Sequence, residues 1–129
     1  MSNLNTNAIT RLATVTGIDA KAVAVTTLYT VPAGYSLVVD HVVVRCTAFT
    51  VGAKGVQAVA SFGGNSATWD DYLNTQTYTV AAVSTKIKDT VLDTATPVYA
   101  AASIFKVSVE TGSDAGAETW AVDVWGYLV

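Results

Sequence analysis

Residues 26–46 place the strongest constraint on how this chain can fold. They read TTLYTVPAGYSLVVDHVVVRC, two Val-rich runs on either side of a Val-Pro-Ala-Gly turn. Pro32 restricts φ at the first corner of a type I turn, and Gly34 adopts left-handed backbone freely. We therefore predict a β-hairpin with strands at 26–31 and 35–46, the second of which spans about 40 Å at about 3.3 Å per residue. Such a long apolar strand favours a β-sandwich.

The rest of the chain has the alternation of an all-β protein. Alternating or short apolar runs bounded by Gly, Pro or Asn predict further strands. These strands lie at 9–25 (one or two, interrupted near Gly17, with a helix at 20–25 as the alternative), 56–62, 76–83, 86–92, 97–101, 104–111 and 119–129. We expect the loop 112–116 to join the last two as a hairpin. About eight antiparallel strands without a helix predict two packed sheets, a jelly-roll-like β-sandwich.

Length and charge bound the domain organisation. The 129 residues suit one domain, which we place at 9–129 after a polar, flexible N-terminal arm at 1–8. Charged residues make up only 13% of the chain, about half the usual share of about 25%. Because interface cores exclude charge, this deficit predicts an exterior that is partly covered by other protein chains, with the arm available to clasp a neighbour.

Charge and composition argue against several classes of protein, namely nucleic-acid-binding, membrane-spanning and disulfide-bonded secreted proteins. The net charge is −3 and Lys and Arg do not cluster along the chain, so we expect no nucleic-acid partner. No apolar run reaches the ~18 residues that would span a bilayer, so we expect no membrane partner. The single cysteine excludes an internal disulfide, and the first residues lack a secretory-signal pattern. We therefore expect the protein to be made and folded in a reducing cytoplasm.

The only histidine and the only cysteine both lie in the long strand. As a catalytic base His41 would need a nucleophile and an orienting carboxylate, and as a metal ligand it would need further ligands. Simple alternation places His41 on one face with Leu37 and Val39, and Cys46 on the opposite face. We therefore predict a partly buried, hydrogen-bonded histidine and a buried, inert thiol. We expect no enzyme, and assign no catalytic, cofactor-binding or metal-binding residue.

The segment Trp69-Asp70-Asp71-Tyr72 carries the richest candidate chemistry. Two carboxylates beside aromatic rings can bind or hydrolyse a sugar. They can also join Asp114 in a calcium site, although no EF-hand-like spacing is present. The third possibility, which we favour, is a solvated loop or a subunit contact in which Trp69 is the buried anchor.

The last strand combines an acidic residue with two aromatic residues on one face. Alternation places Asp123, Trp125 and Tyr127 together. Either this face is open to solvent or to a partner, or Asp123 pairs inside the protein with Arg11, Arg45 or a lysine. Because Trp and Tyr are enriched at interfaces, we favour Trp125 and Tyr127 as partner contacts.

The sequence LYTVPAG at 28–34, followed by a Val-rich strand that ends VVVR at 42–45, resembles small virion proteins of tailed bacteriophages. In these proteins a "lYtvPaGk…vvv" hairpin opens an all-β domain, and the Trp-Gly-Tyr ending at 125–127 is similar too. The resemblance covers the hairpin closely and the remainder only by architecture. Tyr35 departs from it, since a cationic residue commonly follows the glycine.

The resemblance implies two classes of function. The first is a structural virion protein, most specifically a capsid decoration (cement) protein that stabilises the shell by binding between capsid subunits. Its partners would be the major capsid protein or other virion proteins, it would form a homo-oligomer (a trimer by resemblance), and it would lie on the capsid surface after synthesis in the host cytoplasm. The alternative is a receptor- or carbohydrate-binding module of a tail fibre or tail tip, with residues 69–72 as its ligand surface. Neither class implies a cofactor.

Overall fold

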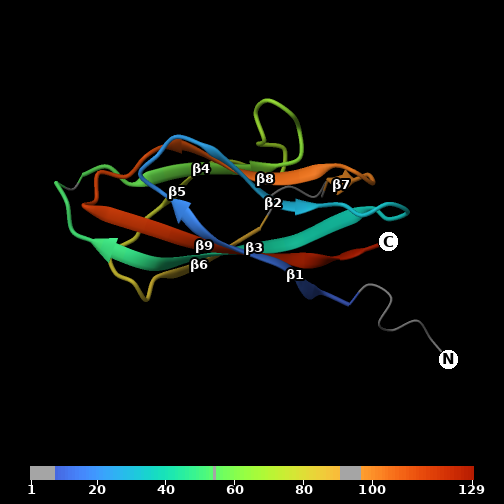
Figure 1. The fold of residues 1–129 in the computed structure, drawn as a ribbon, viewed down its shortest axis with the longest axis horizontal. Helices are drawn as coiled ribbons and strands as arrows, with labels where there is room; N and C mark the ends of the chain where they lie inside the picture. The colour runs from blue at the N-terminus through green and yellow to red at the C-terminus, as the bar shows by residue number, and fades with distance from the viewer. Residues whose placement is uncertain (1–7, 54, 91–96) are drawn as a thin grey trace.

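In the computed structural model, which describes residues 8–53, 55–90 and 97–129, the strands form two antiparallel sheets packed face to face (Figure 1). The first, here called the long-strand sheet, has the order β1 (Thr10–Asp19), β9 (Ala117–Leu128), β3 (Leu37–Thr50) and β6 (Lys86–Asp89), with β7 (Val98–Tyr99) also paired to β3. The second, the short-strand sheet, has the order β2 (Val25–Thr30), β8 (Ile104–Thr111), β4 (Ala58–Gly63) and β5 (Leu73–Tyr78). The predicted all-β sandwich is confirmed, with nine strands among the described residues.

Successive strands mostly alternate between the two sheets, so most connections cross from one side of the sandwich to the other. The described residues include no helix, and hence none that is long and apolar enough to cross a membrane. The helix considered at 20–25 is absent, and β1 continues through Gly17 with a change of register between Val15 and Ile18. Two predictions fall partly outside the described residues, namely the arm at 1–8 and the end of the strand at 86–92.

The predicted hairpin at 26–46 is wrong. β2 pairs with β8 in one sheet and β3 pairs with β9 in the other, so the turn carries the chain across the sandwich. The Tyr35 N–H donates to the Pro32 carbonyl (3.3 Å), and φ is +82° at Gly34, as in a type II turn that starts at Pro32. A turn of this composition suits either connection. Leu28 and Leu37 are buried from opposite sheets, so both strands cover the same core without pairing.

The predicted hairpin through 112–116 is wrong for the same reason. β8 and β9 belong to different sheets, and the connection bonds to other parts of the chain. The Ser113 N–H donates to the Ala20 carbonyl (2.9 Å), and the Gly116 N–H donates to the Thr50 carbonyl (2.8 Å). This connection therefore closes one end of the sandwich.

Aromatic side chains fill the space between the sheets. Trp120, which is fully buried, packs edge-on against Tyr78 with ring centroids 5.4 Å apart. Phe105 contacts Phe62 and Tyr72 at 6.4 and 5.6 Å. The face predicted for the last strand lies in the core, where Trp120, Val122 and Val124 join the core cluster and Leu128 packs against it, and Phe105 and Val107 of β8 join the same cluster. In β9 the opposite face is buried too at Ala121 and Asp123, so burial by itself does not alternate there.

An irregularity in β3 changes which residues face the core. The register with β9 shifts between Val39 and His41, so Asp40 is an extra residue. Leu37 and Val39 are buried before this bulge, whereas Val42, Val44 and Cys46 are buried after it. The predicted face that joined His41 to Leu37 and Val39 is therefore wrong, because one inserted residue moves all later side chains to the other face.

Candidate functional site

The candidate contact residues lie on two separate surfaces. Trp125 and Tyr127 belong to β9 and alternate with its buried residues, so they face outward from the long-strand sheet. Trp69 lies instead over the outer face of the short-strand sheet, where the Lys106 Nζ is 4.3 Å from the centre of its ring. The predicted residues thus do not converge on one site.

Asn65 organises the loop that carries Trp69 and Asp70. Its Nδ2 donates to Thr68 Oγ1 (2.8 Å) and to Asp70 Oδ1 (2.7 Å), and its Oδ1 accepts the backbone N–H groups of Asp70 and Asp71. Thr68 Oγ1 also donates to Asp70 Oδ1 (2.8 Å). The hydrogen bonds from Asn65 and Thr68 lower the pKa of Asp70 below its ordinary value. The Asp70 carboxylate therefore serves mainly to close its own loop.

Asp71 ties this loop to β7. Its Oδ1 accepts from the Gly64 N–H (2.9 Å) and from the Tyr99 hydroxyl (2.8 Å). Burial, together with the neighbouring Asp71 carboxylate, raises the pKa of Tyr99. Across the described residues there is no group of three or more His, Cys, Asp or Glu side chains that could hold a metal ion, so Asp70, Asp71 and Asp114 do not assemble the calcium site considered from the sequence.

Tyr72 is part of the core and not of a ligand surface. Only 3% of it is exposed, and its ring packs edge-on against Phe105. The sequence places Tyr72 next to a surface loop, but its hydroxyl reaches across to the Asp40 carbonyl on β3 (2.9 Å). The aromatic platform expected at residues 69–72 is thereby reduced to Trp69.

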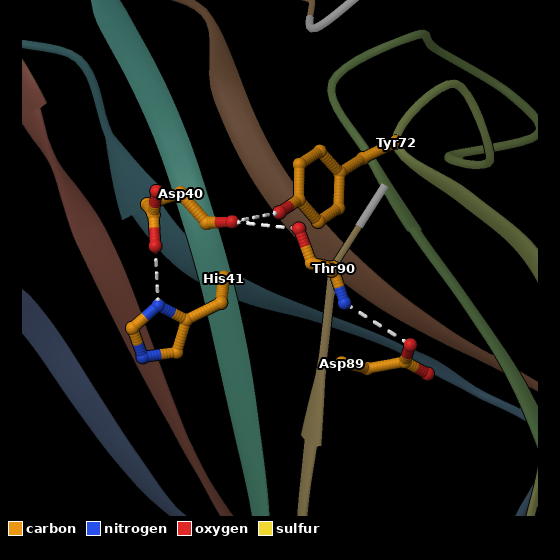
Figure 2. Close-up of polar contacts among 5 residues, drawn as sticks. All are labelled: Asp40, His41, Tyr72, Asp89 and Thr90. Atoms are coloured by element: carbon orange, nitrogen blue, oxygen red, sulfur yellow. Dashed lines mark hydrogen bonds and ion pairs between the residues drawn. The ribbon is translucent and has the colours of Figure 1, made fainter. Parts of the chain in front are cut away.

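The bulge at Asp40 is held by hydroxyl groups (Figure 2). Its carbonyl accepts from the Tyr72 and Thr90 hydroxyls, both at 2.9 Å, which satisfies a group that the bulge displaces from the regular ladder. Thr90 in turn donates its backbone N–H to Asp89 Oδ1 (3.1 Å). The bulge is therefore held in place by two other segments of the chain, the residue before β5 and the residue after β6.

His41 follows the bulge and faces outward. Its Nδ1 lies 2.7 Å from Asp40 Oδ2, and its side chain is 15% exposed, so the predicted hydrogen-bonded, partly buried histidine is confirmed. The ring stacks on Trp125 with centroids 5.6 Å apart and planes within 10°. Cys46 is buried as predicted, with its Sγ 3.3 Å from the Ala48 carbonyl, and burial raises the pKa of its thiol. A raised pKa lowers the fraction of thiolate, which favours the inert thiol predicted from the sequence.

Asp123 joins three strands on the outer face of the long-strand sheet. It accepts from Arg45 Nε (2.8 Å), from Arg45 Nη2 (3.1 Å) and from Thr14 Oγ1 (2.7 Å), although only 5% of the residue is exposed. Burial acts to raise the pKa of Asp123, but the hydrogen bonds from Arg45 and Thr14 outweigh it and lower the pKa overall. Of the partners considered from the sequence, Arg45 is the one that pairs with Asp123, but the pair forms on the outward face and not inside the protein.

This face also gathers basic residues that are scattered in the sequence. Lys88 lies opposite Val43, Lys86 lies opposite Arg45, and Arg11 lies opposite Trp125. Because cross-strand partners share a face, four of the six Lys and Arg residues that the structure describes point to this side. Counting neighbours along the chain could not find the group, although the i, i+2 spacing of Lys86 and Lys88 was a local signal for a shared face.

Comparison with known proteins bears on the fold. No protein-family model matches the chain, and no curated protein matches it. A similar solved structure is a chain of the cyanophage Pam1 capsid asymmetric unit, with a TM-score of 0.56 and 14% identity over 95% of this chain and 86% of that chain. At this identity the likeness shows a shared fold.

Proposed function

We propose that this protein is a structural protein of a phage virion, most specifically a capsid decoration (cement) protein. The observation that carries the proposal is the sandwich that it shares, over nearly its whole length, with a chain from a phage capsid. The phage-like motif at residues 28–34 supports the same class from the sequence. Its place would be the capsid surface, with the major capsid protein or other virion proteins as partners.

The outer face of the long-strand sheet is the surface that we assign to the capsid. It presents Trp125 and Tyr127, residue types that are enriched in interfaces. Around them lie the four basic residues, which favour an acidic partner surface through charge complementarity. The pair between the buried Asp123 and the partly exposed Arg45 keeps the centre of this face ordered before binding, which reduces the entropy cost of association.

The mechanism that we propose is binding alone, without catalysis. A protein that binds the assembled shell more tightly than its separated subunits stabilises the shell by mass action, by about 2.7 kcal/mol per site at a free concentration 100 times Kd. A homo-oligomer, which we expect to be a trimer, would bridge several capsid subunits at once and multiply this effect. Sedimentation velocity of the purified protein tests the trimer.

Particles that lack the protein provide the test of function. Purified protein added back should bind such particles to a saturable stoichiometry and raise the temperature at which they release their DNA. The tail-module alternative predicts the opposite pattern, in which the protein ignores capsids and adheres to host cells or glycans. That second pattern would overturn the decoration proposal. The geometry argues against it, because Tyr72 is buried and Asp70 and Asp71 accept hydrogen bonds from their own loop.

A further inference from the structure

A pocket of about 210 Å³ opens at one end of the sandwich. It lies among the connections that follow β3, β5 and β8, at the end opposite the C-terminus (Figure 1). Apolar side chains form most of its lining, namely Phe49, Val51, Val56, Val80, Ala81 and Ala115. Val51 and Val56 are 72% and 46% exposed, so the pocket continues into an apolar surface at its mouth.

A buried acidic residue also lines this pocket. Glu118 is only 2% exposed, and the Trp120 indole N–H donates to its Oε2 (2.8 Å). The ion pairs found among the described residues are His41–Asp40 and Arg45–Asp123, and neither includes Glu118. Lys21, a nearby cation, donates instead to the Ala115 carbonyl.

Buried acidic side chains in proteins are normally paired with a cation, because an isolated buried charge is costly. Among the described residues, the lining of this pocket includes Glu118 and Asp114 but no lysine or arginine. The pocket therefore has a buried acidic residue, Glu118, and walls that are mostly apolar. The complementary ligand is a cation on an aliphatic stem.

We infer that this pocket binds the side chain of a lysine supplied by a partner protein. The methylene groups would pack against the Val51 and Val80 walls, and the ammonium group would bond to the Glu118 carboxylate. The volume is below the about 300–1,000 Å³ of pockets that hold drug-sized ligands, which suits a single side chain. A compact ammonium on a slender stem fits such a space better than the planar, forked guanidinium of arginine.

This site lies at the end of the sandwich, apart from the outer face of the long-strand sheet. It does not depend on the proposed function, and its test uses the purified full-length protein alone. Failure of that test would leave the capsid-binding experiment unaffected.

The test is an NMR titration that follows the Trp120 indole N–H. The probe is Nα-acetyl-lysine-N-methylamide, and the matched control is the same molecule with its side-chain amine acetylated. We expect a saturable shift at millimolar concentrations of the probe, and binding of the neutral control at least about tenfold weaker. In Glu118→Gln, which keeps an oxygen for the indole N–H to bond, this preference should disappear.

A second pair of variants keeps the test decisive should Glu118→Gln fail to fold. Val51→Ser should weaken probe binding about threefold by removing part of the wall. Val98→Ser, at a similarly exposed valine beside the start of β3, should leave it unchanged. Equal shifts with both probes, a preference retained in Glu118→Gln, equal effects of the two valine variants, or no shift at all would each overturn the inference.

Discussion

The outer faces of the two sheets differ in how their buried polar side chains are hydrogen-bonded. Each has buried polar side chains on its central strands, Asp123 on the long-strand sheet and Ser61 on the short-strand sheet. Asp123 joins charged and hydroxyl groups of three strands. Ser61 Oγ accepts the Thr75 N–H (2.9 Å) where the register of β4 and β5 breaks, so it replaces a missing ladder bond.

The two faces also differ in what covers them. On the short-strand sheet, the Asn65-centred loop places Trp69 against Lys106, so an aromatic residue and a cation are already paired within the chain. On the long-strand sheet, Trp125 stacks on His41, and Lys86 and Lys88 remain exposed. The comparison teaches that the aromatic residue over the short-strand sheet, Trp69, is used to hold a loop. The aromatic residues of the long-strand sheet are instead presented around the ordered Asp123–Arg45 pair.

The largest effect is expected where β9 approaches β3 beside the bulge. A Cβ at Gly126 would lie 2.1 Å from the Val38 carbonyl oxygen, a backbone atom that cannot move aside without separating the strands. We expect Gly126→Ala to reduce the free energy of unfolding by about 3 kcal/mol or more, measured by urea denaturation. Gly116→Ala is the control, since its nearest neighbour would lie at 3.0 Å and a small shift relieves it. Equal losses would show that backbone approach at the bulge is not special.

Asp123→Asn and Ser61→Ala test the two buried polar centres against each other. Asp123→Asn leaves Arg45 without its carboxylate, and we expect a loss of about 2–3 kcal/mol, moderated because Arg45 is partly exposed. Ser61→Ala leaves one backbone N–H without its acceptor, and we expect about 1 kcal/mol. Denaturant unfolding of both variants makes the comparison. A larger loss of unfolding free energy from Ser61→Ala than from Asp123→Asn would contradict the greater contribution that we assign to the charged centre of the long-strand sheet.

Trp125→Ala and Trp69→Ala separate the faces by function. If the long-strand sheet meets the capsid, Trp125→Ala should weaken particle binding about 30-fold, as expected when an aromatic anchor that contributes about 2 kcal/mol is removed. Trp69→Ala should change particle binding less than about twofold. Circular dichroism of both variants controls for folding, and a stronger effect of Trp69→Ala would move the interface to the other sheet.

At low pH the contribution of the ionised Asp123 to folding stability should be lost. The pKa of Asp123 lies below its ordinary value in the folded protein, so its contribution is present above the unfolded-state pKa of about 3.9 and is lost as the pH falls through the folded value. The stability difference between wild type and Asp123→Asn should therefore be constant above about pH 5 and shrink below about pH 4. Urea titrations at a series of pH values measure it, and a gap that does not narrow in acid would exclude an ionised Asp123 as its source.

Local pattern predicted most of the strands but little of their pairing. Alternation in β8 and β9 marks the buried face correctly, because neighbouring side chains on a strand always point to opposite sides. The same rule failed for His41, since a single extra residue at Asp40 inverts the alternation and leaves no mark in composition. Trp69 and Tyr72 looked alike in sequence, yet only the packing against Phe105 determines that Tyr72 is buried.

The sequence by itself determined an all-β chain of low charge, the place of most strands, and a Pro-Ala-Gly turn after residue 31. The tertiary structure decided that this turn crosses between sheets, that Arg45 and Thr14 meet Asp123, and that Glu118 lines a pocket. The physical reason is that strand formation depends on neighbouring residues, whereas pairing depends on which distant strands bury a common face. In a sandwich whose chain alternates between sheets, nearly every functional contact is of that second kind.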